Sequence, residues 1–167
     1  MKPRIFIGSS VEGLSVAYAI QKNLMRDAEV TIWDQGAFEL SKTTIEALMK
    51  IIETFDFGIF VFSKDDITKI RGTERETVRD NVIFELGLFI GHLGRERVYF
   101  VKPMNEDIYV PTDLLGITPG EYEANRADLN FEAATGSFCH QIKLQIKAVG
   151  KRSAEYSGLK ISNSKMA

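Results

Sequence analysis

Phe57-Gly58-Ile59-Phe60-Val61-Phe62 is apolar at every position except one glycine. This pattern is typical of a strand in a parallel sheet that helices cover on both faces, so that neither face meets water. We therefore predict that residues 57–62 form the central strand of such a sheet. The rest of the chain alternates short β-rich runs with helical patterns, which indicates an α/β fold.

Outward from this run, the hydrophobic spacing predicts about five strands and four helices. The predicted strands cover residues 4–7, 30–33, 57–62 and 97–101, with a brief edge strand at 121–123. The predicted helices cover residues 14–25, 82–93 and 131–149, with one more after a cap at Ser41 or Thr43. The side chains expected to pack inward are Ile45, Leu48, Met49, Ile52, Phe138, Ile142, Leu144 and Ile146. Residues 65–80 carry dense charge of both signs and are predicted to form a solvated loop.

Length and composition limit the kinds of function that this chain can have. A chain of 167 residues corresponds to about one domain, which we place at residues 1–150, with a polar tail or linker at 151–167. A net charge of −2 favours neither nucleic acid nor an anionic membrane as partner. No apolar run reaches the ~18 residues of a membrane span, so a cytoplasmic location is expected. One cysteine and two histidines make a structural metal cage improbable; Cys139 is expected in the core and His92 on the surface.

The first candidate site is the turn Gly8-Ser9-Ser10 between the first strand and the first helix. Such a junction presents free backbone N–H groups and a positive helix dipole, which suit a phosphate. Ser10 stands where a dinucleotide fingerprint would have glycine, and the Gly-Lys-Ser/Thr ending of a P-loop is missing. Ligand contact and simple helix capping by Ser9 or Ser10 both remain open.

Glu85 is the second candidate because its neighbours are almost all apolar: Val82-Ile83-Phe84-Glu85-Leu86-Gly87-Leu88. A carboxylate there must be paired, protonated or turned toward a cleft. Asp80 or Asn81 can cap this helix, and both place polar groups near Glu85. The structural alternative is a carboxylate that holds the helix to a neighbouring loop. Trp33 and Phe38 flank the loop after the second strand, where either ring could stack on a ligand or pack into the core.

Several stretches together carry a family pattern. They are Phe6-Ile7-Gly8-Ser9-Ser10, residues 33–38, residues 56–61, residues 111–116 and the long block Arg79-Asp80-Asn81-Val82-Ile83-Phe84-Glu85-Leu86-Gly87-Leu88-Phe89. The chain from about residue 4 to 123 resembles the bacterial TIR-like nucleotide-binding family, best known as the TIR domains fused to STING domains in anti-phage CBASS effectors. The resemblance implies a flavodoxin-like TIR fold, with a central parallel sheet of about five strands and helices on both faces.

The same resemblance implies cleavage of NAD⁺ at the nicotinamide–ribose bond, with Glu85 as the catalytic residue. Substrate contacts are then expected from Gly8, Ser9, Ser10, Trp33, Phe38, Asp80 and Asn81. No metal and no separate cofactor are expected, because NAD⁺ is itself the substrate.

The family also assembles through the loop after the second strand, here from Asp34 to Leu40. The resemblance therefore implies a homo-oligomer, with a fused or associated STING domain that senses a cyclic dinucleotide. No STING-sized segment follows residue 150, so an excised domain or a stand-alone relative is expected. Two other functions stay open: a non-catalytic assembly module, and glycosyl transfer resembling that of nucleoside deoxyribosyltransferases, with Glu85 as a covalent nucleophile.

Overall fold

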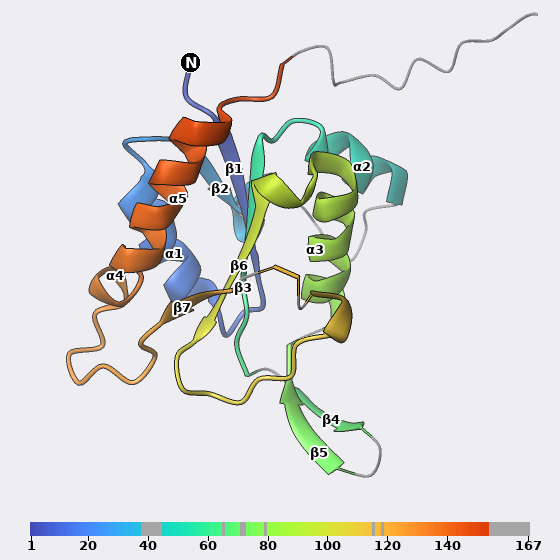
Figure 1. The fold of residues 1–167 in the computed structure, drawn as a ribbon, viewed down its shortest axis with the longest axis vertical. Helices are drawn as coiled ribbons and strands as arrows, with labels where there is room; N and C mark the ends of the chain where they lie inside the picture. Colours follow the sequence, from blue (N-terminus) through green and yellow to red (C-terminus); the bar gives the residue numbers. More distant parts are fainter. Residues whose placement is uncertain are drawn as a thin grey trace, which may run out of the picture.

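A computed structural model describes residues 1–37, 45–64, 66–70, 73–78, 80–114, 116–117 and 119–153. Its centre is a five-stranded parallel sheet of order β2-β1-β3-β6-β7 (Figure 1). The strands are β1 (Arg4–Ser9), β2 (Glu29–Ile32), β3 (Phe57–Val61), β6 (Val98–Pro103) and β7 (Gly120–Tyr122). β3 is buried at every position and lies in the middle of the sheet, which confirms the prediction made from its apolar run.

Helices cover both faces of the sheet, as an α/β fold requires. The helices α1 (Leu14–Leu24), α4 (Phe131–Ala134) and α5 (Gly136–Val149) lie on one face. The helices α2 (Ile45–Ile52) and α3 (Asp80–Leu93) lie on the other face (Figure 1). None of the helices in the described part of the chain is long and apolar enough to span a bilayer.

The alternation of side chains along each strand divides the core into two chemically different halves. Aliphatic residues such as Ile5, Ile7 and Ile59 pack under α1 and α5. Phenylalanines pack under α2 and α3, where Phe6 stacks on Phe89 of α3 with ring centroids 4.9 Å apart. The aromatic half holds α3 firmly against the sheet, and α3 is the helix that carries Glu85.

The prediction of a solvated loop at residues 65–80 is wrong. β4 (Asp66–Ile70) pairs with antiparallel β5 (Thr73–Thr77) in a separate two-stranded sheet. The hairpin extends away from the carboxyl ends of the parallel strands (Figure 1). Both strands contain β-branched residues, Ile and Thr, among their charged residues, and β-branched residues are enriched in strands.

Three smaller expectations also need correction. The last helix is two helices, because α4 ends before Thr135 and α5 begins at Gly136. Ile45 is 59% exposed and Leu144 is 53% exposed, so neither belongs to the core. Both lie on outward faces of their helices, and helical spacing alone does not show which apolar residues face the sheet. The other predicted core positions are buried or partly buried, namely Leu48, Met49, Ile52, Phe138, Ile142 and Ile146.

Candidate functional site

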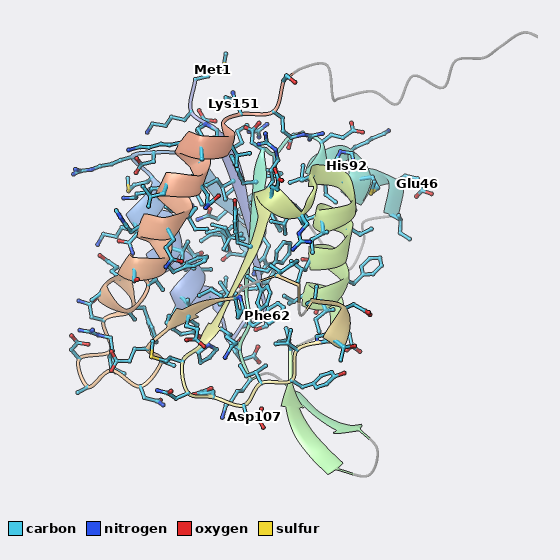
Figure 2. The ribbon with its side chains drawn as sticks, viewed as in Figure 1. Met1, Glu46, Phe62, His92, Asp107 and Lys151 are labelled. Atoms are coloured by element: carbon cyan, nitrogen blue, oxygen red, sulfur yellow. The ribbon has the colours of Figure 1, made fainter. Side chains whose placement is uncertain are left out.

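The carboxyl edge of the sheet gathers most of the predicted site residues. Ser9 ends β1, Trp33 directly follows β2, and Ser63 lies two residues after the end of β3. The β4–β5 hairpin follows β3 at the carboxyl edge of the sheet, and α3 follows the hairpin. Because β6 starts at the opposite edge just after α3, the first turn of α3 lies near the carboxyl edge. Ligands of open parallel sheets bind at this edge, and Figure 2 labels Phe62 there, at the end of β3.

Two hydroxyl contacts organise the turn after β1. The indole Nε1 of Trp33 donates a hydrogen bond to Oγ of Ser9 at 2.9 Å. The hydroxyls of Ser10 and Ser63 are 3.0 Å apart and hydrogen-bonded. Ser9 and Ser10 are only 4% and 3% exposed, so each already has a protein partner in a nearly closed environment.

These contacts overturn the helix-cap interpretation of Ser9 and Ser10. The N-cap of α1 is Gly13, whose backbone N–H donates to the carbonyl of Ser10. Gly8 also has a packing reason to be glycine, because a Cβ there would lie 2.6 Å from the Phe60 ring. Whether the turn also contacts a ligand stays a prediction.

Glu85 is where the sequence placed it, on the buried side of α3. Its side chain is 2% exposed, and within the described residues no hydrogen bond reaches its Oε1. Burial raises the pKa of Glu85 from 4.5 to about 7, because the desolvated environment disfavours the charged form. Among the described residues, Oε1 is therefore not an atom through which Glu85 holds α3 to a neighbouring loop.

Other predicted site residues are placed less favourably or lie outside the described residues. Asp80 and Asn81 are exposed and form the first turn of α3, not the cap before it. An acidic side chain such as Asp80 there interacts favourably with the helix dipole. Phe38 lies outside the described residues, as do residues 39 and 40 of the predicted assembly loop.

The beginning of that loop is held by α1, which the sequence did not suggest. The Tyr18 hydroxyl donates to Oδ2 of Asp34 at 2.6 Å, and Nε2 of Gln21 donates to Oε1 of Gln35 at 2.8 Å. Tyr18 and Gln21 are three residues apart and so share a helix face. The sequence spacing of Tyr18 and Gln21 could have shown that they share a face. Only the pairing of β1 with β2 shows that this face meets residues 34 and 35.

Two predictions about single side chains have opposite outcomes. Cys139 is buried in the core, as expected, and burial raises the pKa of its thiol to about 11. His92 is not the expected surface histidine. It is partly buried, and in the described part of the chain its buried Nε2 has no hydrogen-bond partner. Figure 2 places it at the end of α3 away from the carboxyl edge.

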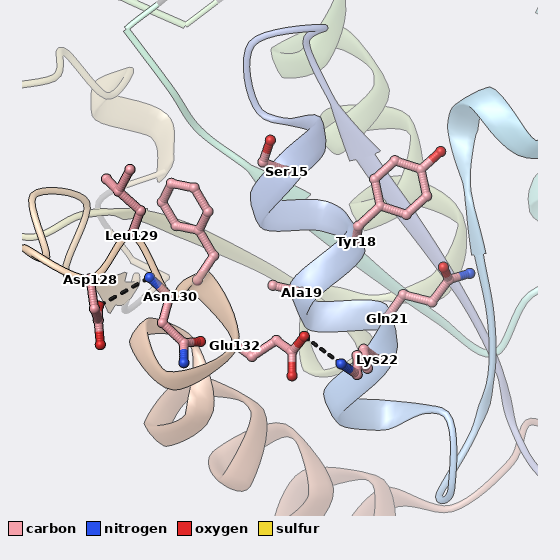
Figure 3. A pocket seen from close by; sticks show the side chains of 10 residues that line it. Ser15, Tyr18, Ala19, Gln21, Lys22, Asp128, Leu129, Asn130 and Glu132 are labelled. Atoms are coloured by element: carbon pink, nitrogen blue, oxygen red, sulfur yellow. Dashed lines mark hydrogen bonds and ion pairs between the residues drawn. The ribbon is translucent and has the colours of Figure 1, made fainter.

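A hollow lies away from the predicted site residues. It has a volume of about 730 Å³ and separates α1 from residues 128–132 (Figure 3). Lys22 and Glu132 form an ion pair across it at 2.6 Å. Its lining is mostly polar, comes in equal parts from α1 and from residues 128–132, and contains none of the residues predicted to bind substrate.

Comparison with known proteins assigns the family. The family model described as "CAP12/Pycsar effector protein, TIR domain" matches residues 4–124. The chain belongs to this family of bacterial anti-phage TIR effectors. The match covers the whole parallel sheet together with α1, α2 and α3, and therefore also the carboxyl edge and Glu85. It confirms the resemblance deduced from the sequence motifs.

Curated relatives agree with this CAP12/Pycsar TIR assignment. The chain is 36% identical over 149 residues to the Pycsar effector protein PaPycTIR of Pseudomonas aeruginosa, covering 89% of this chain and 48% of that protein. It is 44% identical over 137 residues to CD-NTase-associated protein 12 of Flavobacterium daejeonense, covering 79% and 43%. The chain thus spans about half the length of the curated relatives it matches.

Among solved structures, the flavodiiron core of Flv1 from Synechocystis is similar in fold. The TM-score is 0.53 at 14% sequence identity, and the alignment covers 88% of this chain and 36% of that one. At this identity the likeness concerns only the arrangement of strands and helices. It supports the flavodoxin-like architecture that the parallel sheet shows directly.

Proposed function

We propose that this TIR domain is an NAD⁺ glycohydrolase that cleaves the nicotinamide–ribose bond. The observation that carries the proposal is Glu85: a carboxyl group inside an apolar helix face, with its pKa raised to about 7 by burial. Perturbed carboxyl groups of this kind concentrate at functional sites. Glu85 also lies in the part of α3 that is nearer the ligand-binding edge of the sheet.

The chemistry explains why one carboxylate suffices. Most glycosidases need a second carboxyl group to protonate the leaving group. In NAD⁺ the nicotinamide ring is already a cationic pyridinium. When the C1′–N bond breaks, its electron pair goes to nitrogen, and neutral nicotinamide departs without protonation by an acid. The positive charge that develops on the ribose is stabilised by the Glu85 carboxylate. Water then forms the new bond to C1′ and loses a proton to solvent, giving ADP-ribose.

The apolar surroundings of Glu85 have two opposite effects on this step. They strengthen its attraction to a positive transition state, because charges interact more strongly where water is excluded. They also favour the protonated acid in the resting protein, since the pKa is about 7. The nicotinamide cation of bound NAD⁺ opposes that protonation, so substrate binding itself generates the active carboxylate.

Activation is proposed to require self-association through the loop from Asp34 to Leu40. The hydrogen bonds from Tyr18 and Gln21 support this assignment, because they fix residues 34 and 35 where the loop begins. The names of the relatives, a Pycsar effector and a CD-NTase-associated protein, support a role downstream of cyclic-nucleotide signalling in anti-phage defence. A fused or associated STING domain that senses a cyclic dinucleotide is one form of that input.

The test is incubation of the protein with NAD⁺ at rising protein concentration, with nicotinamide release followed by chromatography. Glu85→Gln is the matched variant, because it removes the charge and keeps the volume. We expect nicotinamide from the parent and a loss of at least a hundredfold in the variant, about 2.7 kcal/mol of transition-state stabilisation. Cleavage by the variant within about tenfold of the parent would rule out the catalytic role of Glu85.

A trapping experiment separates this mechanism from deoxyribosyl transfer. A nucleophilic Glu85 would form a covalent ribosyl adduct that mass spectrometry detects after acid quenching during turnover. We expect no adduct on the peptide that contains Glu85. A protein that leaves NAD⁺ intact even when clustered would instead be a non-catalytic assembly module.

A further inference from the structure

The contact between Ser9 and Trp33 joins a rigid strand to a partly exposed aromatic ring. Oγ of Ser9 accepts the hydrogen bond from Nε1 of Trp33 at 2.9 Å. Trp33 is the only tryptophan in the chain, and it packs partly buried against both halves of the core. It stands at the first position after β2, at the carboxyl edge of the sheet.

Ser9 is a firm anchor for this ring. It pairs with Val61 of the central strand β3 and is 4% exposed. The Cβ of Ser9 also lies close to the turn that begins α1, since a Cβ added at Gly13 would be 3.1 Å from it. Nε1 is the only polar atom of an indole, and a hydrogen bond at that atom fixes the direction in which the ring plane points.

We propose that Ser9 is a positioning residue that holds the Trp33 indole as the platform on which a ring of the substrate stacks. The inference rests on the proposed cleavage of NAD⁺, whose nicotinamide and adenine are both flat rings. Stacking depends on ring orientation, so the alignment of Trp33 by Ser9 contributes to substrate affinity. Ser9 thus acts through Trp33, and a phosphate contact by its hydroxyl is not needed.

The neighbouring serine offers a matched control. Ser10 is equally buried, and its hydroxyl bonds to that of Ser63. Ser10→Ala therefore removes a similar hydrogen bond from the same turn without removing the partner of Trp33. Trp33→Phe is the complementary variant, because it retains an aromatic ring and lacks the N–H.

The first experiment measures Trp33 fluorescence in the absence of NAD⁺. Ser9→Ala is expected to shift the emission to longer wavelength and to increase quenching by acrylamide, because the freed indole N–H turns toward water. Ser10→Ala is expected to leave the spectrum unchanged. An unchanged spectrum in Ser9→Ala, or an equal shift in both variants, would overturn the positioning role. This readout does not depend on whether the protein cleaves NAD⁺.

The second experiment measures the kinetics of NAD⁺ cleavage. Ser9→Ala is expected to raise KM by roughly three- to tenfold, the effect of one lost hydrogen bond, with kcat within about twofold of the parent. In a Trp33→Phe background the same substitution is expected to change KM by less than about twofold, because the two residues act as one unit. An undiminished effect of Ser9→Ala in that background would overturn the inference.

Two further outcomes keep the inference separate from the proposed function. If Ser9→Ala does not fold, Trp33→Phe alone is expected to raise KM, and an unchanged KM there would overturn the platform role. If the parent protein releases no nicotinamide, the proposed function fails. In that case NAD⁺ titrated into Glu85→Gln is still expected to quench Trp33 fluorescence, and an absence of quenching would also overturn the platform role.

Discussion

Asp56 and Arg152 lie 96 residues apart in the sequence, yet Oδ1 of Asp56 accepts a hydrogen bond from the backbone N–H of Arg152 at 2.8 Å. The other oxygen, Oδ2, accepts one from the backbone N–H of Arg4 at 2.9 Å. One carboxylate therefore ties the start of β1 to the chain that leaves α5. Figure 2 shows Met1 and Lys151 at this same end of the molecule, opposite the carboxyl edge of the sheet.

Arg97 strengthens the same junction from the far side of β3. Its Nη1 donates to the carbonyl of Gly150 at 2.7 Å, and its guanidinium lies over the Phe57 ring, 5.1 Å from the centroid. Gly150 has φ of +72° and ψ of −178°, a backbone conformation that is essentially restricted to glycine. The direction in which the chain leaves α5 is thus fixed by side chains on the sheet.

Asp56→Ala is expected to lower the free energy of unfolding by about 2 kcal/mol, because two backbone N–H groups lose a charged acceptor in a nearly buried position. Urea unfolding measures this change. Asp27→Ala is the control, since Asp27 forms a partly exposed ion pair with Lys143 at 3.3 Å and is expected to cost less than about 1 kcal/mol. Equal losses in the two variants would contradict the role of Asp56 as a junction. Hydrogen exchange at Arg152 is expected to accelerate in Asp56→Ala only.

Gly8→Ala is expected to destabilise the protein by about 1–3 kcal/mol, because the added Cβ would lie 2.6 Å from the fully buried ring of Phe60. Gly91→Ala is the opposite case. In α3 the added Cβ meets no described atom within 4 Å, and the helix is expected to gain about 0.5–1 kcal/mol. Thermal unfolding of both variants checks the signs. A neutral Gly8→Ala would contradict the packing role of Gly8 against Phe60.

The sheet was predictable because burial on both faces leaves a strong pattern, as in Phe57 to Phe62. The hairpin was not, although only two residues separate the paired Ile70 and Thr73 and one of them is Gly72, a sound turn signal. Dense charge in residues 65–80 hid the β propensity of Ile and Thr there. The candidate site was likewise predictable only in part: Glu85 could be found from the sequence, and the contacts between strands could not.

Glu85 stood out in the sequence because a carboxyl group is costly among apolar neighbours. The Ser9–Trp33 contact left no such signal, since the residues are 24 positions apart and meet only because β1 pairs with β2. Ser63 was overlooked for the same reason. Contacts made by neighbouring strands depend on the order of strands in the sheet, which local patterns do not reveal.

The raised pKa of Glu85 makes stability depend on pH. The native carboxyl group titrates near 7 and the unfolded one near 4.5, so the folded state binds the proton more tightly between these values. Glu85 therefore disfavours folding increasingly as pH rises from about 4.5 to 7, by roughly 3 kcal/mol in total. Urea unfolding of parent and Glu85→Gln at pH 5 and pH 8 measures it. The difference in stability between variant and parent is expected to favour the variant more at pH 8, and a pH-independent difference would contradict the burial of an ionisable Glu85.

Self-association is expected to control turnover, and substitutions in the loop from Asp34 to Leu40 test this expectation. Ala37, Phe38 and Leu40 are apolar residues in a segment that a monomer gains little by exposing. If the competent state exists only in the oligomer, specific activity rises with protein concentration. Phe38→Asp is then expected to reduce both assembly, measured by light scattering, and nicotinamide release. Tyr18→Phe, which removes the hydrogen bond to Asp34, is expected to weaken both by a smaller factor with Phe38 intact. The deciding measurement dilutes the parent protein well below its association range, where constant turnover per molecule would show that assembly is not required.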